Sequence, residues 1–233
     1  EQKVVCIDGD IGLRNLDVVM GLENRIVYDL VDVIEGRCRL KQAMIRDKRM
    51  PELHLIPAAQ TRDKSSVSPS DMIKLVDELR GEVDWILIDS PAGIERGFRN
   101  VIAPADQIIV ITNPEVSAVR DADRIIGLIE AEEKGPAKLV INRLNPAMIK
   151  HGDMLSADDV LELLAVELLG IIPEDEAVVV STNRGTPVTL DGKTQAAQAF
   201  HNIARRILGE NVPLLEVEGR SDFLDRRSHL FKA

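Results

Sequence analysis

The sequence predicts an α/β fold, a doubly wound and mainly parallel sheet with helices on both faces. Short continuous runs of Val, Ile and Leu recur along the 233 residues, and such runs are typical of parallel strands that are buried on both faces. Segments with helical spacing of apolar residues separate these runs. Strand–helix alternation of this kind predicts right-handed crossovers between parallel strands.

Six segments are expected to be strands because each is an apolar run that ends in polar or turn-forming residues. In chain order they are Val4–Ile7, Leu53–Pro57, Trp85–Asp89, Ile108–Thr112, Lys138–Asn142 and Leu168–Ile172. Helices are expected where apolar residues return every three or four positions. These positions are Ile73, Val76 and Leu79; Ile125, Leu128 and Ile129; Val160, Leu163 and Leu164; and Ala199, Phe200, Ile203, Ala204 and Ile207, in a helix ending at Gly209.

Composition limits the class of protein. The formal net charge of −10 argues against a general nucleic-acid binder, which usually carries a basic face. Cys6 and Cys38 form no disulfide framework and fit a reducing cytosol. We expect one domain over residues 1–209, a linker over 210–219 and a separate tail over 220–233.

Two strands are expected to end in aspartates. Asp8 and Asp10 close the first strand, and Asp89 closes another before Ser-Pro-Ala-Gly. In parallel sheets ligands bind beyond the carboxyl ends of the strands, where carboxylates can hold a divalent cation and an attacking water. For Asp8 and Asp10 the alternative is that they only cap the following turn or helix.

Polar residues also follow three other strands. They are Asn113–Ser117, Asn142–Arg143 and Pro173–Asp175. Together these groups could line a site for a nucleotide base and ribose. From the residues alone, ordinary loop chemistry is the favoured interpretation.

Several long runs resemble the MinD family of the deviant Walker A (ParA/MinD) superfamily of P-loop ATPases. They are C-I-D-G-D-I-G-L-R-N-L-D, G-L-E-N-R-I-V-Y-D-L, P-A-A-Q-T-R-D-K, D-S-P-A-G-I-E, T-N-P-E-V-S-A-V-R-D-A-D-R-I, G-D-M-L-S-A-D-D-V-L and G-I-I-P-E-D. The likeness extends from Lys3 to about Gly209. It implies a P-loop NTPase-like fold and a cytoplasmic ATPase in division-site placement that binds ATP and Mg²⁺.

The resemblance also implies partners. Members of the family dimerise on ATP, recruit the division inhibitor MinC and are stimulated by MinE. They bind peripherally to anionic lipids on the cytoplasmic face of the inner membrane, and no specific nucleic-acid partner is expected.

Residue roles follow from the resemblance position by position. Asp10 matches the catalytic aspartate that positions the attacking water near Mg²⁺, and Asp8 its neighbour in the nucleotide site. Asp89 matches an aspartate that contacts Mg²⁺ through water. The remaining matches are Glu115 for a ribose contact across the dimer, Asn142, Arg143, Pro173, Glu174 and Asp175 for the adenine pocket, and Arg14 and Asp121 for segments used in switching and partner binding.

One departure from the family concerns the phosphate loop. The family carries Lys-Gly-Gly-Val-Gly-Lys-Thr, whose backbone N–H groups and lysines bind the phosphates, whereas the 233 residues contain no G-x-x-x-x-G-K-[ST] segment. We therefore expect these residues to be a fragment without the family's first βα unit, and to bind ATP weakly.

The tail resembles the family's membrane-targeting helix. At about 100° per residue, Phe223, Leu224, Leu230 and Phe231 fall on one arc, as an interfacial helix requires, although Arg227 lies in the middle of that arc. The alternative is a solvated, frayed terminus.

Two other functions stay open. A ParA-type partition ATPase would need a basic surface for DNA, which the charge of −10 disfavours. A non-hydrolysing interaction module would bind a division protein without catalysis.

Overall fold

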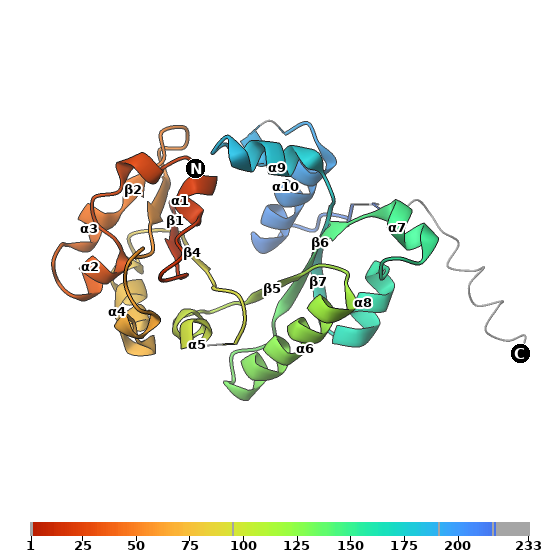
Figure 1. Ribbon diagram of the computed structural model, residues 1–233, viewed down its shortest axis with the longest axis horizontal. Helices are drawn as coiled ribbons and strands as arrows, with labels where there is room; N and C mark the ends of the chain where they lie inside the picture. The colour runs from red at the N-terminus through yellow and green to blue at the C-terminus, as the bar shows by residue number, and fades with distance from the viewer. Residues whose placement is uncertain (1, 95, 191, 216, 218–233) are drawn as a thin grey trace, which may run out of the picture. The chain divides into compact units, whose positions relative to one another are not determined.

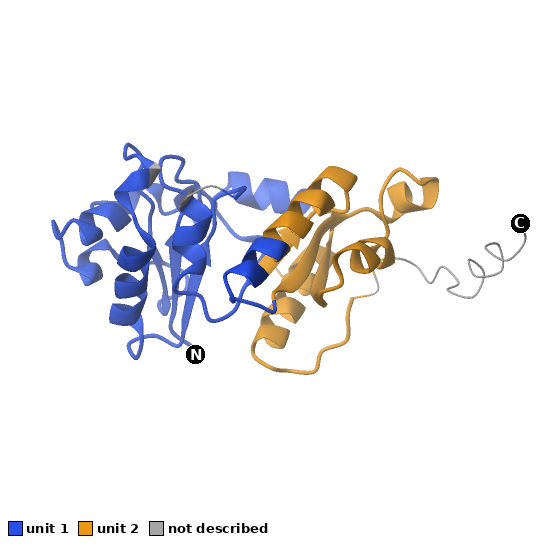
Figure 2. Cartoon of the chain, turned by 90° about the horizontal axis from the view of Figure 1, so that it is seen from below, with its two compact units in different colours: residues 1–108, 127–136, 176–190 blue, residues 109–126, 137–175, 191–233 orange. Residues whose placement is uncertain are grey.

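The computed structural model describes residues 2–94, 96–190, 192–215 and 217. The chain divides into two compact units, coloured separately in Figure 2. Unit 1 comprises Glu1–Ile108, Gly127–Pro136 and Glu176–Leu190, and unit 2 comprises Ile109–Ile126, Ala137–Asp175 and Asp191–Ala233. Each unit carries its own open sheet.

The sheet of unit 1 has the strand order β2-β3-β1-β4. Strands β1 (Val4–Asp8), β3 (Leu53–Ile56) and β4 (Trp85–Asp89) are parallel, whereas β2 (Ile45–Arg46) pairs with β3 in the antiparallel direction. The three parallel strands confirm predicted segments. The sequence did not predict β2, because two residues are too few to show a pattern.

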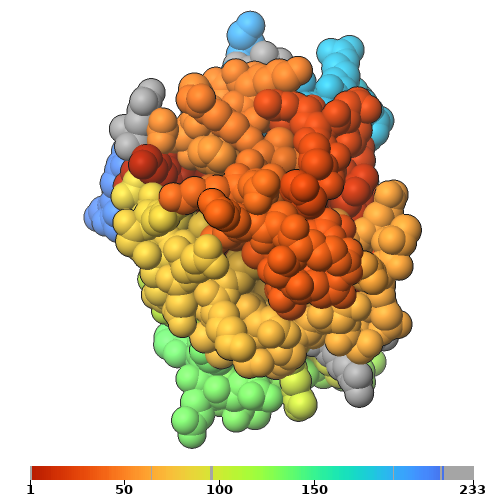
Figure 3. Space-filling model, turned by 90° about the vertical axis from the view of Figure 1, so that its left-hand side faces the viewer, coloured from red at the N-terminus to blue at the C-terminus, as the bar shows by residue number. Residues whose placement is uncertain are grey.

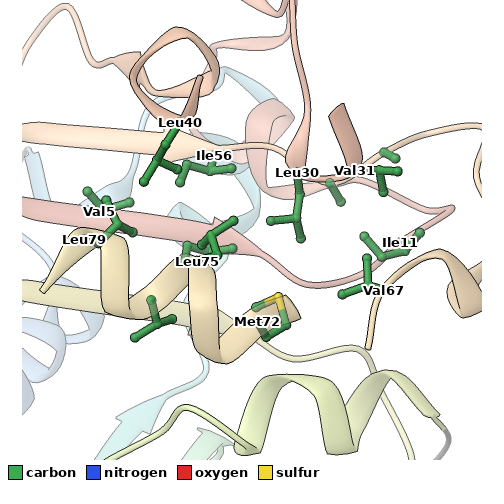
Figure 4. Packing of buried hydrophobic residues seen from close by; sticks show 14 residues of the cluster. Val5, Ile11, Leu30, Val31, Leu40, Ile56, Val67, Met72, Leu75 and Leu79 are labelled. Carbon is green, nitrogen blue, oxygen red and sulfur yellow. The ribbon is translucent and has the colours of Figure 1, made fainter. Parts of the chain in front are cut away.

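Helices cover one face of this sheet and bury its main core (Figure 4). They are α2 (Leu30–Ile34), α3 (Leu40–Ala43) and α4 (Pro69–Leu79). Helix α4 begins with a capping box between Ser68 and Asp71 and has Pro69 in its first turn. Its buried residues are Met72, Leu75, Val76 and Leu79. The predicted apolar stripe is wrong at Ile73, which is 40% exposed, because the buried face is rotated by one residue toward Met72. The outer surface of this part of unit 1 is shown in red to yellow in Figure 3.

A smaller core contains Cys6, Met20, Leu22, Ile45 and Leu55. Helix α1 (Leu16–Val19) and the 3₁₀ helix η1 (Glu23–Arg25) lie in this part of the chain. The other elements of unit 1 are η2 (Lys64–Ser66), α5 (Arg96–Ile102), the end of α6, α9 (Glu176–Asn183) and η3 (Val188–Leu190).

Unit 2 contains a parallel sheet of three strands, in the order β5-β6-β7. These are β5 (Ile109–Thr112), β6 (Lys138–Leu144) and β7 (Glu167–Pro173), and all three confirm predicted segments. Helices α6 (Val116–Ala131) and α8 (Ala157–Leu164) lie on one side of the sheet, and α10 (Gln195–Ile207) lies on the other (Figure 1). A short helix, α7 (Pro146–His151), follows β6.

Gly170 allows α10 to approach β7 closely. A Cβ atom at Gly170 would lie 2.3 Å from Cγ1 of Ile203 in α10. Arg206 in the same helix donates to the carbonyl oxygens of Leu169, Val212 and Pro213. These hydrogen bonds connect α10 both to β7 and to the segment that follows the helix.

The predicted fold class is confirmed: both sheets are open, all pairs of longer strands are parallel, and helices cover the sheets. Each sheet ends in a strand with exposed apolar side chains, at Leu87 in β4 and at Ile109 and Ile111 in β5. Among the described residues, no helix has the length and apolar character of a membrane span. The boundaries at residues 209 and 219 stay predictions, and the tail lies outside the described residues.

Candidate functional site: an acidic strand end and a polar strand end

Asp8 and Asp89 are directly paired in register at the carboxyl ends of β1 and β4. The next residue, Gly9, donates its backbone N–H to the carbonyl oxygen of Asp89 at 3.0 Å. A Cβ at Gly9 would lie only 2.6 Å from that oxygen. The strand ends therefore meet backbone to backbone, which brings the carboxylates of unit 1 together.

Asp8 is only 1% exposed, and its carboxylate shapes the loop that follows β1. One oxygen accepts the N–H of Asp10 at 3.0 Å, and the other accepts the N–H of Leu16, the first residue of α1, at 3.3 Å. Burial raises the pKa of Asp8, the charge of Asp10 adds to the rise, and the backbone donors oppose it. The contacts of Asp8 are therefore those of a residue that caps the following loop and helix. A role of Asp8 in nucleotide binding stays a proposal.

Asp10 presents a different environment. Its Oδ1 atom is buried and has no hydrogen-bond partner among the described residues. Its backbone carbonyl accepts the N–H groups of Leu13 and Arg14, so the loop turns tightly around it. A buried carboxylate oxygen without a donor is costly unless water, a metal-bound water or another ligand supplies one.

Asp89 completes the acidic group. Although Asp89 is exposed, partial desolvation raises the pKa of its carboxyl, and the negative charges of Asp8 and Asp10 raise it further. A nearby cation would relieve this repulsion.

Mg²⁺ fits these residues through water rather than through a protein cage. Within the described part of the chain, no three His, Cys, Asp or Glu side chains are arranged to hold a metal ion directly. Mg²⁺ usually keeps several of its waters and uses one or two carboxylates together with substrate phosphates. Asp10 and Asp89 suit that mode of binding.

The polar residues at the ends of β6 and β7 come together in unit 2. Leu144 is in register with Pro173, and the N–H of Glu174 donates to the carbonyl of Leu144 at 3.0 Å. Arg143 has a left-handed backbone with φ of 56°, and its guanidinium contacts Glu174 at 2.9 Å. The predicted group therefore forms one cluster, with Asn142 and Arg143 on one strand and Pro173 to Asp175 at the end of the next.

Sequence reasoning missed Asn145 in this cluster. Its Nδ2 donates to Glu174 at 2.9 Å, while its Oδ1 caps α7 by accepting the N–H groups of Ala147 and Met148. Donation from Asn145 and then from Arg143 lowers the pKa of Glu174. The available signal was Asn before Pro146, a typical helix start.

Arg14 belongs to the loop of Asp10, and the remaining predicted residues lie elsewhere in the chain. Glu115 is exposed directly before α6, and its carbonyl accepts the N–H of Val119. Asp121 is exposed on α6. Arg14 has φ of 37°, and its Nε lies 3.1 Å from the buried carboxylate of Asp17. Phe223, Leu224, Leu230 and Phe231 lie outside the described residues.

Known proteins are similar to this chain in sequence and in fold. The family model described as "Cellulose biosynthesis protein BcsQ" matches residues 39–208. The septum site-determining protein MinD of Bacillus subtilis is 53% identical over 219 residues, which cover 93% of this chain and 82% of that protein.

Two solved structures extend the comparison. The MinC:MinD cell division protein complex of Aquifex aeolicus aligns with a TM-score of 0.86 and 47% identity over 94% of this chain and 88% of that chain. MinD of Pyrococcus horikoshii, complexed with Mg-ADP, aligns with a TM-score of 0.78 and 25% identity over 88% and 83% of the two chains.

Proposed function

The chain belongs to the MinD family of septum site-determining ATPases, and from that premise we propose that Asp10 is its catalytic residue. The family membership establishes an ATPase of division-site placement that uses ATP and Mg²⁺. The alternatives, a ParA-type partition ATPase and a non-hydrolysing module, are not favoured by these relatives.

The observation that carries the proposal is the buried, unpartnered Oδ1 of Asp10 beside the paired Asp8 and Asp89. An attacking water that donates to this oxygen would be oriented for in-line attack on the γ-phosphate. Mg²⁺, when bound, neutralises charge that develops on the phosphate oxygens. In this proposal Asp89 accepts hydrogen bonds from the waters around Mg²⁺, while Asp8 holds the loop of Asp10 in place.

The cluster in unit 2 is proposed to bind the base and ribose. Asn142 and the turn from Pro173 to Asp175 offer amide and backbone groups to adenine. The Arg143–Glu174 contact and Asn145 keep that turn in one conformation. Glu115, exposed before α6, is proposed to contact the ribose of a second copy.

The proposed partners follow from the relatives. The Aquifex aeolicus structure is a complex of MinC and MinD, which supports recruitment of a MinC-like inhibitor by this chain. We further propose ATP-dependent homodimerisation, stimulation by a MinE-like regulator and peripheral binding to anionic lipids of the inner membrane through residues 220–233.

The test is Asp10→Ala in the intact ATPase. We expect hydrolysis to fall by about 100-fold or more while the Kd for ATP changes by less than about threefold, because an aspartate that orients the attacking water acts mainly in the transition state. Asp71→Ala is the control, since Asp71 serves only the capping box of α4. Turnover in the Asp10 variant at the level of the control would show that the catalytic assignment is wrong.

A further inference from the structure

Helix α1 directly follows the loop of Asp10 and depends on tertiary contacts for its stability. It has four residues, and a helix of one turn is unstable without tertiary contacts. At its start, the N–H of Leu16 donates to Asp8, which also accepts the N–H of Asp10. The position of α1 is therefore linked to the loop of Asp10 through the carboxylate of Asp8.

The end of α1 is held by Arg49, from the loop between β2 and β3. Its Nη2 donates to the carbonyl of Met20 at 2.6 Å, and its Nη1 donates to the carbonyl of Gly185 at 2.9 Å. Gly185 lies in the turn that follows α9. One guanidinium thus ties α1 to a segment more than a hundred residues later in the chain.

Asp47 fixes this guanidinium. Asp47 is 3% exposed, and its carboxylate accepts hydrogen bonds from both Nε and Nη2 of Arg49, at 3.3 and 2.9 Å. The backbone N–H groups of Arg49 and Met50 donate to the same carboxylate. Although burial acts to raise the pKa of Asp47, these donors lower it on balance. Such a bidentate ion pair fixes the plane of the guanidinium. The carbonyls of Met20 and Gly185 must therefore lie within reach of its remaining N–H groups.

Two glycines bring the joined segments into backbone contact. Gly21 and Gly185 have φ of 65° and 60°, and a Cβ on Gly21 would lie 2.6 Å from the carbonyl oxygen of Gly185. The two turns therefore pack without side chains between them, and Arg49 holds them at their edge.

We propose that Arg49 is a positioning residue of the ATPase. It fixes α1 against the turn after α9, which keeps the N–H of Leu16 on Asp8 and thereby holds the loop of Asp10 in place. The inference rests on the proposed function of Asp10. It adds that residues 47–49, on a different hairpin, control how well that aspartate is oriented.

The first test compares Arg49→Lys with Arg46→Lys by amide hydrogen exchange. Lysine keeps the charge but loses the planar fork. Arg46 is a matched control on the same hairpin, because its Nε donates only to the carbonyl of Pro51. In Arg49→Lys we expect exchange of the amides in residues 9–16 and 184–186 to rise by about tenfold or more, as for a segment that has lost its anchor. Unchanged exchange in residues 9–16 would overturn the proposal.

The second test measures turnover in the intact ATPase. Arg49→Lys should lower kcat by about tenfold with the KM for ATP within about twofold, the pattern of a lost transition-state interaction. Leu79→Ala, in the buried core of α4, serves as a destabilised control whose kcat should be unchanged. If Arg49→Lys shows only the lower melting temperature of Leu79→Ala, Arg49 is merely structural and the inference fails. The hydrogen-exchange result tests the role of Arg49 whether or not Asp10 is catalytic. The catalytic role of Asp10 is tested separately, by the turnover of Asp10→Ala.

Discussion

Asp8 and Asp89 are in register on neighbouring parallel strands, and both have raised pKa values, Asp8 because it is buried and the exposed Asp89 because it is partly desolvated beside other carboxylates. This is an unfavourable arrangement for folding. A carboxyl whose pKa is higher in the folded than in the unfolded state loses stabilising free energy as the pH rises through the folded value. The acidic strand ends therefore weaken unit 1 at neutral pH, as is common for functional sites.

Asp89→Asn should consequently stabilise the chain. At pH 7 we expect the free energy of unfolding to rise by about 0.5 kcal/mol, since the substitution removes a like charge beside Asp8 that is screened by solvent at the exposed Asp89. The difference should disappear as the pH falls toward the ordinary aspartate value of 3.8, because the wild-type carboxyl is then protonated. Urea unfolding at several pH values measures this. An equal gain at pH 7 and at acid pH would contradict the electrostatic cause.

Glycine-to-alanine substitutions at Gly170 and Gly127 should have opposite signs. At Gly170 the new methyl would lie 2.3 Å from Ile203, so we expect a loss of about 1–3 kcal/mol from overpacking. At Gly127, inside α6, nothing lies within 4 Å of the new Cβ, and alanine should add about 0.5–1 kcal/mol through helix propensity. Thermal unfolding of the two variants gives the comparison.

Arg206 should hold the segment that follows α10. In Arg206→Met the carbonyls of Leu169, Val212 and Pro213 lose their donor, and we expect faster proteolysis and amide exchange around residues 210–213. Arg205→Met is the matched control, because Arg205 makes only an exposed ion pair with Glu210. Equal protease sensitivity in both variants would contradict this role.

The tail prediction concerns residues outside the described structure. If Phe223, Leu224, Leu230 and Phe231 form an insertion face, one short helix binds membranes marginally, and ATP-dependent dimerisation raises the avidity. Sedimentation of the intact ATPase with anionic liposomes should therefore depend on ATP and be lost on truncation after Gly219.

Arg227→Leu extends this test. Removing the charge from the apolar arc should strengthen binding and reduce its dependence on anionic lipid and ATP. ATP-dependent sedimentation of the truncated protein at the wild-type level would rule out the tail as the anchor.

The strands were predictable because continuous apolar runs are a local signal. The acidic residues were predictable from the strand ends, since Asp8 and Asp89 each close such a run and Asp10 follows Asp8 by two residues. The contacts of Arg49 could not be predicted from a local sequence pattern, because its partners Met20 and Gly185 are 29 and 136 residues away. The unpartnered Oδ1 of Asp10 likewise depends on how the whole loop packs, which the sequence alone does not express.

The outer strands of the two sheets have a practical consequence. Leu87, Ile109 and Ile111 are exposed on β4 and β5, and these short strands carry neither the lysines nor the prolines that usually protect a sheet edge. Open edges of this composition recruit other strands, so the polypeptide in concentrated solution should self-associate by adding strand to strand. The time for which the purified protein stays unaggregated then depends on its concentration. The substitution Ile111→Lys should lengthen that time.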